Sequence, residues 1–441
     1  MRVVRRVHQL RAPGRDVQGA RRGAAGGRGL VRAQVKPAGG IQARYLLLLS
    51  TFALVGFGLV MIYSASSVAD YVKHADTAYH LKRQLMWIVV GLVAMFAADL
   101  WGYRLARKFA WLAWGVPLAG LLAVPFVGET IAGSKRWIRV GGMQVQPSEY
   151  AKFGCVLLAA WLVSQYRSGK LTEREHAMGQ ALCALPVLAL VFFQPDMGTT
   201  MSIAFAWFIV LVLGGLEKGT LVGLGAFGLI GTLLGVFSEP YRAARFFAFL
   251  DPWKDPRGDG YQIIQGLLAF GSGGPGGVGL GMSRQKYLYL PAAHTDFIFA
   301  IVGEELGLLG TLGVVAAFGI FAYAGFRIAT LCRDPFGRVL AGGLTAMIVV
   351  QAVMNMMAVT QMMPVTGIPL PLVSYGGSSL SFTLACIGVI LGVSREGSRL
   401  SPVRTKPRPG REEVRDEVPA VGGRDGRSRA SGADRRRRAA S

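Results

Sequence analysis

The chain has 441 residues, of which 52% are hydrophobic, and its apolar residues are gathered into long runs. These runs and a mean hydropathy of +0.41 exclude an ordinary soluble globular protein and indicate an integral membrane protein. The formal net charge of +23 is concentrated at the two ends of the chain.

The two ends lack the apolar periodicity that a folded core needs. Residues 1–44 are rich in Arg, Gly and Ala, while residues 396–441 alternate Arg with acids, Pro and Gly. We expect a basic disordered arm and a charged disordered tail, both in the cytoplasm. Contact with anionic lipid head groups is favoured over binding to nucleic acid. The arm is too long and polar for a cleaved signal peptide, so the first span should remain as an anchor.

The apolar runs predict an all-α polytopic membrane protein with about ten transmembrane helices, each of roughly 20 residues. This membrane domain covers residues 45–395 and has a large extracytoplasmic loop, residues 238–296, between helices 7 and 8. Residues 178–215 could form one kinked helix, but Gln194-Pro195-Asp196 favours two spans joined by a tight outer turn. The predicted spans lie near residues 45–65, 84–100, 107–128, 148–165, 178–194, 197–215, 219–237, 297–326, 338–358 and 376–394.

An even number of spans places both termini on one side, and the basic tails and short basic loops make that side the cytoplasm. The outer loops nevertheless keep Lys and Arg residues, at 135–139 and 242–286. An anionic ligand at the outer face is the leading explanation. Pairing with Asp251, Asp255 and Asp259 is the alternative.

One basic motif precedes the fourth span and another lies at its start. Lys135 and Arg136 lie beside Trp137, an arrangement that suits a pyrophosphate group but is also common in membrane-interface anchors. Glu149 and Lys152 are three residues apart at a helix start, so they share one face and can pair. The pair is either a structural ion pair or a site where Lys152 holds an anion and Glu149 tunes that contact.

Two segments are dense in Gly or Pro. Residues 258–281 have too many glycines for a helix, and we expect a loop that lets the backbone approach a bulky ligand. No Gly-Lys-Ser/Thr follows these glycines, which disfavours a nucleotide. Residues 364–379 hold three prolines and three glycines, so this segment should be re-entrant or line a cavity.

His294-Thr295-Asp296 stands where the eighth span begins. An acid in that position is costly near hydrocarbon and is usually retained for chemistry or transport. The other acids at membrane depth, Asp196 and Glu304-Glu305, are equally consistent with packing. The four cysteines are expected to be small buried apolar residues without a disulfide or metal role.

Five strings in this order resemble the SEDS family (shape, elongation, division and sporulation), polytopic glycosyltransferases that polymerise lipid II into peptidoglycan. The resemblance covers roughly residues 45–395. The wording of residues 249–256 and 260–265 looks more like the division and sporulation branch (FtsW, SpoVE) than the elongation branch (RodA). The strings are Lys135–Ile138, Gln146–Lys152, Gln194–Gly198, His294–Phe299 and Pro371–Ser379.

The resemblance implies that Asp296 is the catalytic acid and that Glu149 and Lys152 position it or the substrate. Ala292 stands where the family often has an acid, and Asp259 replaces a usual Ser, which leaves open whether Asp259 substitutes for the lost acid. The substrate-binding residues expected from the motifs and the resemblance are Glu149, Lys152, Lys135, Arg136, Gln262, Lys286, His294, Thr295 and Ser374.

An α-linked lipid pyrophosphate donor that becomes a β-linked glycan inverts once, so one base and a stabilised leaving group suffice. Asp296 would be the base. Outer-face cations would stabilise the pyrophosphate. A divalent ion such as Mg²⁺ or Mn²⁺ is the candidate cofactor that would assist them. The resemblance further implies a bacterial cytoplasmic membrane location. The implied partners are lipid II, a class B penicillin-binding protein transpeptidase, membrane lipids and other division proteins.

A lipid II flippase is the main alternative, because it would use the same cations and acids. A transporter should place its essential charges near mid-depth and show an inverted repeat. Here the charged strings cluster at the outer loops and no repeat is evident, which favours the transferase. A scaffold that only recruits division proteins would leave the outer cations and Asp296 unexplained.

Overall fold

A computed structural model describes residues 38–131, 134–140 and 143–399. The predictions for residues 1–37 and 400–441, which make up most of the arm and the tail, lie outside this part of the chain. The prediction that the disordered arm extends to residue 44 was wrong for residues 38–44, since the first helix begins at Ala38. The long helices of the described residues are α1 (Ala38–His74), α2 (Tyr79–Ala97), α4 (Ala110–Val127), α5 (Pro147–Arg167), α6 (Glu173–Phe193), α7 (Met197–Gly214), α8 (Lys218–Phe237), α11 (Ile298–Leu331), α12 (Pro335–Val359) and α13 (Gly377–Arg399).

These helices confirm the predicted all-α polytopic fold. Within the described residues, nine helices are long and apolar enough to cross a membrane. The tenth, α5, is less apolar and lies buried among its neighbours. A π-helical turn, η1 (Ala98–Gly102), and the short α3 (Tyr103–Lys108) extend α2. The break at Gln194-Pro195-Asp196 is confirmed, since α6 ends at Phe193 and α7 begins at Met197.

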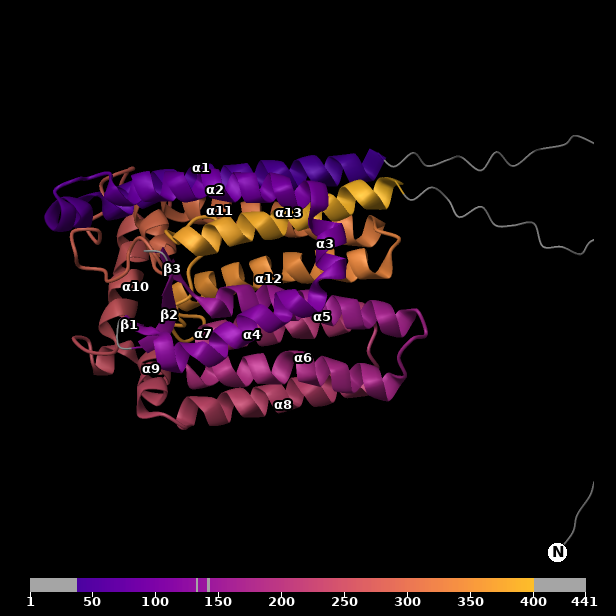
Figure 1. The fold of residues 1–441 in the computed structure, drawn as a ribbon. Helices are drawn as coiled ribbons and strands as arrows, with labels where there is room; N and C mark the ends of the chain where they lie inside the picture. Colours follow the sequence, from indigo (N-terminus) through magenta and orange to yellow (C-terminus); the bar gives the residue numbers. More distant parts are fainter. Residues whose placement is uncertain (1–37, 132–133, 141–142, 400–441) are drawn as a thin grey trace, which may run out of the picture. The chain divides into compact units, whose positions relative to one another are not determined.

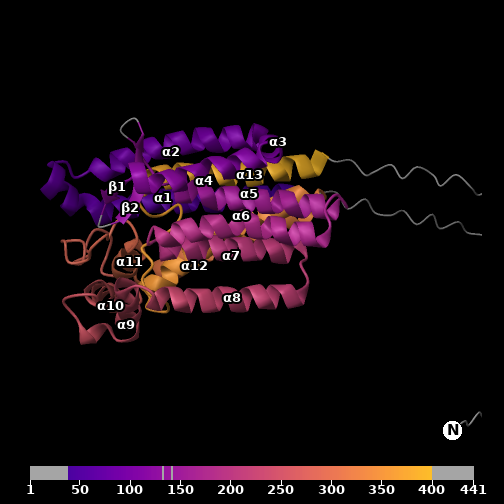
Figure 2. The same cartoon turned by 60° about the horizontal axis from the view of Figure 1, so that its bottom comes forward.

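Helix α12 is the centre of the bundle. It packs against α5, α7, α11 and α13. In its most apolar stretch of 18 residues, 83% of the residues are buried. Helix α8 is the most exposed of these helices, since only 6% of its most apolar stretch is buried. It lies along one edge of the bundle (Figure 2). The bundle therefore offers α12 as a rigid platform for side chains that must be held in place.

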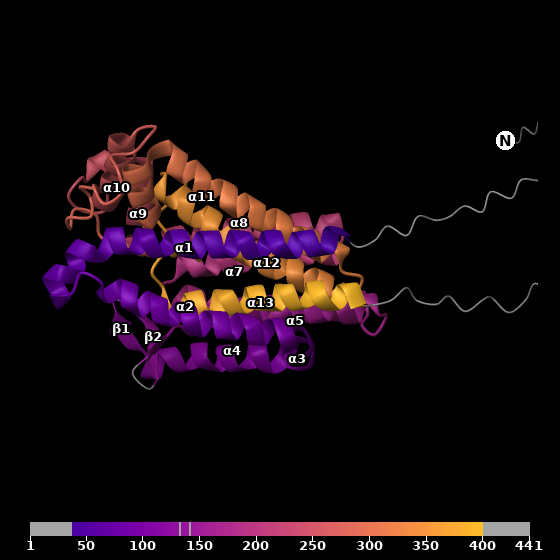
Figure 3. The ribbon, with the colours of Figure 1, turned by 90° about the horizontal axis from the view of Figure 1, so that it is seen from above.

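The two ends of the bundle differ. The start of α1 and the end of α13 lie together at one end, whereas the short strands and the helices α9 (Pro240–Leu250) and α10 (Tyr261–Gly273) gather at the other (Figures 1 and 3). This arrangement agrees with an even number of spans. The end that carries α9 and α10 also carries His294-Thr295-Asp296.

The outer segments contain regular structure that was not predicted. The strands β1 (Glu129–Ile131), β2 (Ser134–Val140) and β3 (Met143–Val145) form an antiparallel sheet in the order β1-β2-β3. The aromatic and β-branched residues Trp137, Ile138 and Val145 favour strands, but the runs are too short to stand out in the sequence.

The expectation that residues 258–281 are wholly non-helical was wrong. Residues 261–273 form α10, because Ile263, Ile264 and Ala269 give it a buried apolar face. The glycines are most densely spaced at the end of this helix and just after it, at residues 271–281, where the backbone contacts α11. The predicted outer loop 238–296 thus contains α9, the 3₁₀ turn η2 (Pro252–Lys254) and α10.

The segment between α12 and α13 is irregular, as predicted. Residues 360–376 contain no α-helix, yet Ile368, Leu370 and Val373 are buried. Irregular backbone at this depth needs hydrogen-bond partners other than water. Those partners belong to the site described next. The four cysteines are free and buried, as expected.

Candidate active site

The His294–Asp296 segment is the turn that leads into α11. Phe297, which is 1% exposed, anchors it in the core, while Asp296 remains half-buried. The Thr295 hydroxyl donates to Asp296 Oδ1 over 2.6 Å. Burial raises the pKa of the Asp296 carboxyl, and the Thr295 hydroxyl and the charge of Arg245 act in the opposite direction. A carboxyl of this kind suits proton transfer.

The irregular segment 360–376 holds this turn through its backbone. Ser374 Oγ donates to the Thr295 carbonyl over 2.5 Å, and the Tyr375 N–H donates to the His294 carbonyl over 2.9 Å. Gly367 faces the acid, because a Cβ built there would lie 3.8 Å from Asp296 Oδ2. The predicted residues His294, Thr295, Asp296 and Ser374 therefore form one unit.

Asn355 on α12 ties the same two segments together. Its side-chain amide donates to the Asp296 carbonyl over 2.7 Å and to the Ile368 carbonyl over 2.8 Å. Asn355 is 2% exposed. Because α12 is the packed centre of the bundle, this amide fixes both Asp296 and the segment that faces it.

Glu149 and Lys152 form the predicted ion pair, with 2.8 Å between Lys152 Nζ and Glu149 Oε1. Ser379 donates to Glu149 over 2.8 Å, and Lys152 donates to Gln351 Oε1 over 2.6 Å. Gln351 in turn donates to the Pro369 carbonyl over 3.0 Å. The pair thus reaches the irregular segment through Gln351, and its contribution to the site is to position that segment.

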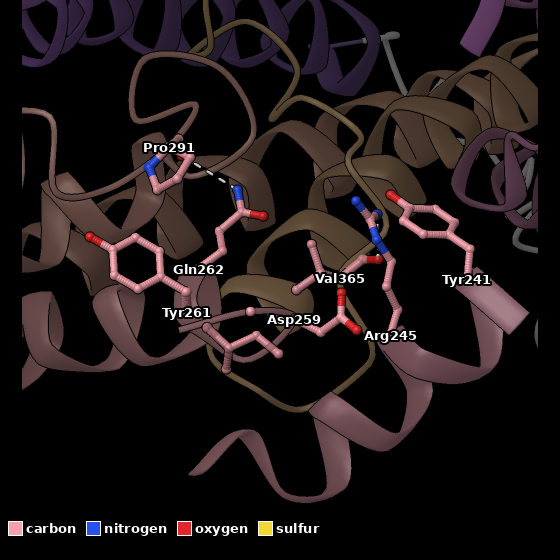
Figure 4. A pocket seen from close by; sticks show the side chains of 9 residues that line it. Tyr241, Arg245, Asp259, Tyr261, Gln262, Pro291 and Val365 are labelled. Atoms are coloured by element: carbon pink, nitrogen blue, oxygen red, sulfur yellow. Dashed lines mark hydrogen bonds between the residues drawn. The ribbon is translucent and has the colours of Figure 1, made fainter. Parts of the chain in front are cut away.

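A cavity of about 240 Å³ is lined by Pro291, three residues before His294, and by Val365, two residues before Gly367 (Figure 4). Gln262, a predicted substrate-binding residue, lies on its wall, where its amide donates to the Pro291 carbonyl over 3.4 Å. Arg245 and Asp259 line the same cavity. Its walls come from α9, α10 and both segments around Asp296, and include Tyr241, Arg245, Gly258, Asp259, Tyr261, Gln262, Ile263, Pro291 and Val365.

His294 packs against His80, at the start of α2, and against Tyr375. Its ring centroid lies 4.6 Å from that of His80 and 5.9 Å from that of Tyr375. His80 contacts the buried Asp70 through Nδ1. Burial, followed by the charge of His80, lowers the pKa of His294 to about 4. The imidazole is therefore neutral at physiological pH, which makes it a packing and hydrogen-bonding group there.

Three predicted cationic ligands make no ion pair with Asp296 in the described part of the chain. Arg136 binds the turn between α6 and α7: Nε donates to the Gln194 carbonyl over 3.1 Å, and Nη1 lies 3.7 Å from Asp196. Lys286 is 6% exposed and faces Glu305 at 3.7 Å, beneath the glycine-rich segment. Lys135 is exposed on β2. Among these, only Lys135 presents a side chain free to meet a ligand.

Known proteins resemble this chain over most of its length. A family model described as a cell cycle protein, FTSW_RODA_SPOVE, matches residues 45–399. The chain belongs to the FtsW/RodA/SpoVE family. Stage V sporulation protein E of Bacillus subtilis is 40% identical over 354 residues, which span 79% of this chain and 96% of the relative. The probable peptidoglycan glycosyltransferase FtsW of Trichlorobacter lovleyi is 38% identical over 368 residues, spanning 82% and 95%.

Solved structures resemble this FtsW/RodA/SpoVE family member as well. A chain from the structure "Structural coordination of polymerization and crosslinking by a peptidoglycan synthase complex" matches with a TM-score of 0.66 and 33% identity, covering 80% of this chain and 98% of that chain. The rod shape determining protein RodA of Thermus thermophilus matches with a TM-score of 0.60 and 30% identity, covering 79% and 96%.

Three residues of this family member were missed by the sequence analysis as site residues. Gln351 and Asn355 are polar and four apart in an otherwise apolar helix, and polar groups at membrane depth are themselves a signal of function. Arg245 was noted only as one of many outer cations. Its place on the cavity wall depends on how α9 folds beside α10, which the sequence pattern does not specify.

Proposed function

We propose that this chain is a peptidoglycan glycosyltransferase that polymerises lipid II into glycan strands at the outer face of the cytoplasmic membrane, in division or related wall synthesis. The observation that carries this proposal is Asp296. It is a half-buried carboxyl whose pKa is raised by burial, it is held by Thr295 and Asn355, and it feels the charge of Arg245, which lines the cavity. The named activity of the FtsW relatives supports the same reaction.

In this mechanism Asp296 takes a proton from the acceptor sugar hydroxyl as that oxygen attacks the anomeric carbon of the donor. A raised pKa makes the carboxylate a stronger base, which favours this transfer. The single displacement inverts the α-linked donor to a β-linked product. Glu149, Lys152, Gln351 and Asn355 act through the irregular segment and keep Asp296 in place.

A divalent ion would supply charge stabilisation for the departing pyrophosphate. Mg²⁺ is commonly held by one or two carboxylates together with substrate phosphates. Among the described residues, no group of three or more His, Cys, Asp and Glu side chains is placed to hold a metal ion. The site therefore suits such an ion only if the substrate supplies most of the ligands, with Asp296 or Asp259 as the protein donors.

The short basic loops support an orientation with both termini in the cytoplasm. With both termini in the cytoplasm, the end that bears α9, α10 and Asp296 faces outward, where lipid II is presented. A class B penicillin-binding protein transpeptidase is the proposed partner. The resemblance to a chain of a peptidoglycan synthase complex supports this pairing.

The proposal is tested by reconstituting the full chain with its transpeptidase in vesicles that contain lipid II. Wild-type protein should produce a ladder of glycan polymers on gels, and Asp296→Asn should produce none while remaining folded. Lipid II movement across the bilayer without any polymer would instead establish a flippase. Polymer formed equally by both proteins would remove Asp296 from the mechanism.

A further inference from the structure

We infer that Arg245 is the residue that holds the leaving pyrophosphate of the lipid-linked donor. This inference deepens the proposed function and rests on it for the identity of the substrate. Arg245 lies on α9, outside the five strings that carry the family resemblance. It is therefore assigned from its surroundings.

Three of the other cations predicted to bind phosphate are already occupied by the protein, and the exposed Lys135 does not line the cavity. Arg136 binds two carbonyls and Asp196. Lys152 pairs with Glu149 and donates to Gln351. Lys286 is buried against Glu305. Releasing any of them toward a ligand would leave a buried carboxylate or carbonyl without its partner, which is costly.

Arg245 has no such commitment. Its one hydrogen bond, from Nη1 to the Val365 carbonyl, is 3.5 Å long, at the limit for such a bond. Among the described residues no carboxylate lies within ion-pair distance of its guanidinium, although Asp259 lines the same cavity. A half-buried guanidinium without an anionic partner is poised to receive one.

The guanidinium is also fixed in direction. Arg245 Cζ lies 4.7 Å from the ring centroid of Tyr241, so the planar group stacks on an aromatic face. Figure 4 shows Arg245 and Tyr241 together on the α9 side of the cavity. The guanidinium is planar, and contact with the ring restricts the direction in which its paired N–H groups face, which suits the paired oxygens of a phosphate.

Residues 365–367 connect the cavity wall at Arg245 to Asp296. Val365 accepts from Arg245 and lines the cavity, while Gly367 faces Asp296 Oδ2. The positive charge of Arg245 also acts on the Asp296 carboxyl. Displacement at the anomeric carbon needs a base for the acceptor hydroxyl and a cation for the leaving pyrophosphate. Asp296 and Arg245 supply these two groups at opposite ends of the segment.

The cavity has the size of a head-group fragment. Its volume of about 240 Å³ is below the roughly 300–1,000 Å³ of pockets that enclose a drug-sized ligand. A diphosphate with part of one sugar fits this scale. The lipid tail and the rest of the glycan would extend outside it.

The step balances as follows. A bond forms between the acceptor hydroxyl oxygen and the anomeric carbon of the donor, and the hydroxyl proton passes to Asp296. The bond between that carbon and the phosphate oxygen breaks, and its electron pair leaves with the pyrophosphate. Because the leaving group gains negative charge during the step, its bonds to Arg245 strengthen in the transition state.

The test measures binding of farnesyl pyrophosphate, a short isoprenoid pyrophosphate, to the purified full chain by calorimetry. Arg245→Gln should weaken binding at least tenfold, and Arg245→Lys should weaken it less because it keeps the charge without the planar fork. Arg257→Gln is the matched control, since it removes an exposed cation from the same outer loop and should bind as the wild type does.

Wild-type affinity in Arg245→Gln would overturn the inference, as would failure of the wild type to bind the probe. Asp259→Asn should leave binding unchanged or improve it, and a loss there with Arg245→Gln unaffected would point to a metal-bridged site instead. Circular dichroism checks folding.

In the polymerisation assay Arg245→Gln should lower kcat more than it raises KM. Binding by a wild type that makes no polymer would reject the proposed function while leaving Arg245 as the pyrophosphate ligand.

Discussion

The ion pair between Glu149 and Lys152 offers a quantitative test of how the site is held. We consider Glu149→Gln, Lys152→Met and the double variant. The side chains are 11% and 4% exposed, and their charged atoms are 2.8 Å apart. At an effective dielectric constant of 20 their attraction is about 6 kcal/mol, most of which offsets the desolvation of the two charges.

Each single variant strands one buried charge. Glu149→Gln leaves the Lys152 ammonium with Gln351, and Lys152→Met leaves the Glu149 carboxylate with the Ser379 hydroxyl. We expect each to lower the free energy of unfolding by about 3 kcal/mol. The double variant removes both charges together and strands neither, so it should lose less than either single variant, where additivity would give about 6 kcal/mol.

The assay is reversible unfolding in mixed detergent micelles, analysed as a double-mutant cycle. Lys170→Met is the matched control, because it removes an exposed lysine from a loop and should change stability by less than about 0.5 kcal/mol. Polymerisation should stay low in the double variant, since the tie from Lys152 through Gln351 to Pro369 is lost. Additive effects of the two single variants would refute the interpretation that they form one buried pair.

Three further predictions concern the same site. Asn355→Leu leaves the Asp296 and Ile368 carbonyls unpaired, so it should lower stability by about 2 kcal/mol and polymerisation at least tenfold, measured by unfolding and by glycan gels. The raised pKa of Asp296 means that its protonated form stabilises the fold at low pH and that this contribution is lost as pH rises through that pKa. Asp296→Asn should therefore raise Tm at pH 7, and the gain should shrink toward pH 4, measured by thermal scans. Arg136→Gln should lower Tm by loosening the turn at Gln194–Asp196, with kcat per folded molecule unchanged in the gel assay.

Each of these has a clear contrary result. Full polymerisation by Asn355→Leu would mean that the amide does not position Asp296. A lower Tm for Asp296→Asn at pH 7 would contradict the raised pKa. Loss of lipid II affinity in folded Arg136→Gln would return this arginine to the group of substrate ligands that its sequence context first suggested.

The sequence was most informative where the relevant contacts are local. Pro195 predicted the break between α6 and α7, and the spacing of Glu149 and Lys152 predicted their pairing, because helix geometry relates residues three apart. The cost of an acid at the start of a membrane helix singled out Asp296. The Gly and Pro content of residues 364–379 predicted the irregular segment that clasps it.

The contacts that complete the site join residues far apart in the chain. Lys152 and Gln351 are 199 residues apart, and Arg136 and Gln194 are 58 apart. The residue types show that a charge or an amide is present but not which carbonyl it will meet. The same limit hid Arg245, since its role depends on the cavity between α9, α10 and Val365.

The central claim is that Asp296 is the base of a glycosyl transfer. The most direct measurement is the rate of glycan polymerisation from lipid II by wild type and Asp296→Asn, at equal concentrations of folded protein and across pH. Wild-type activity should fall on the acid side at a pH above the ~3.9 of an ordinary aspartate, with no polymer from the variant at any pH. Polymerisation by Asp296→Asn at the wild-type rate would contradict the claim.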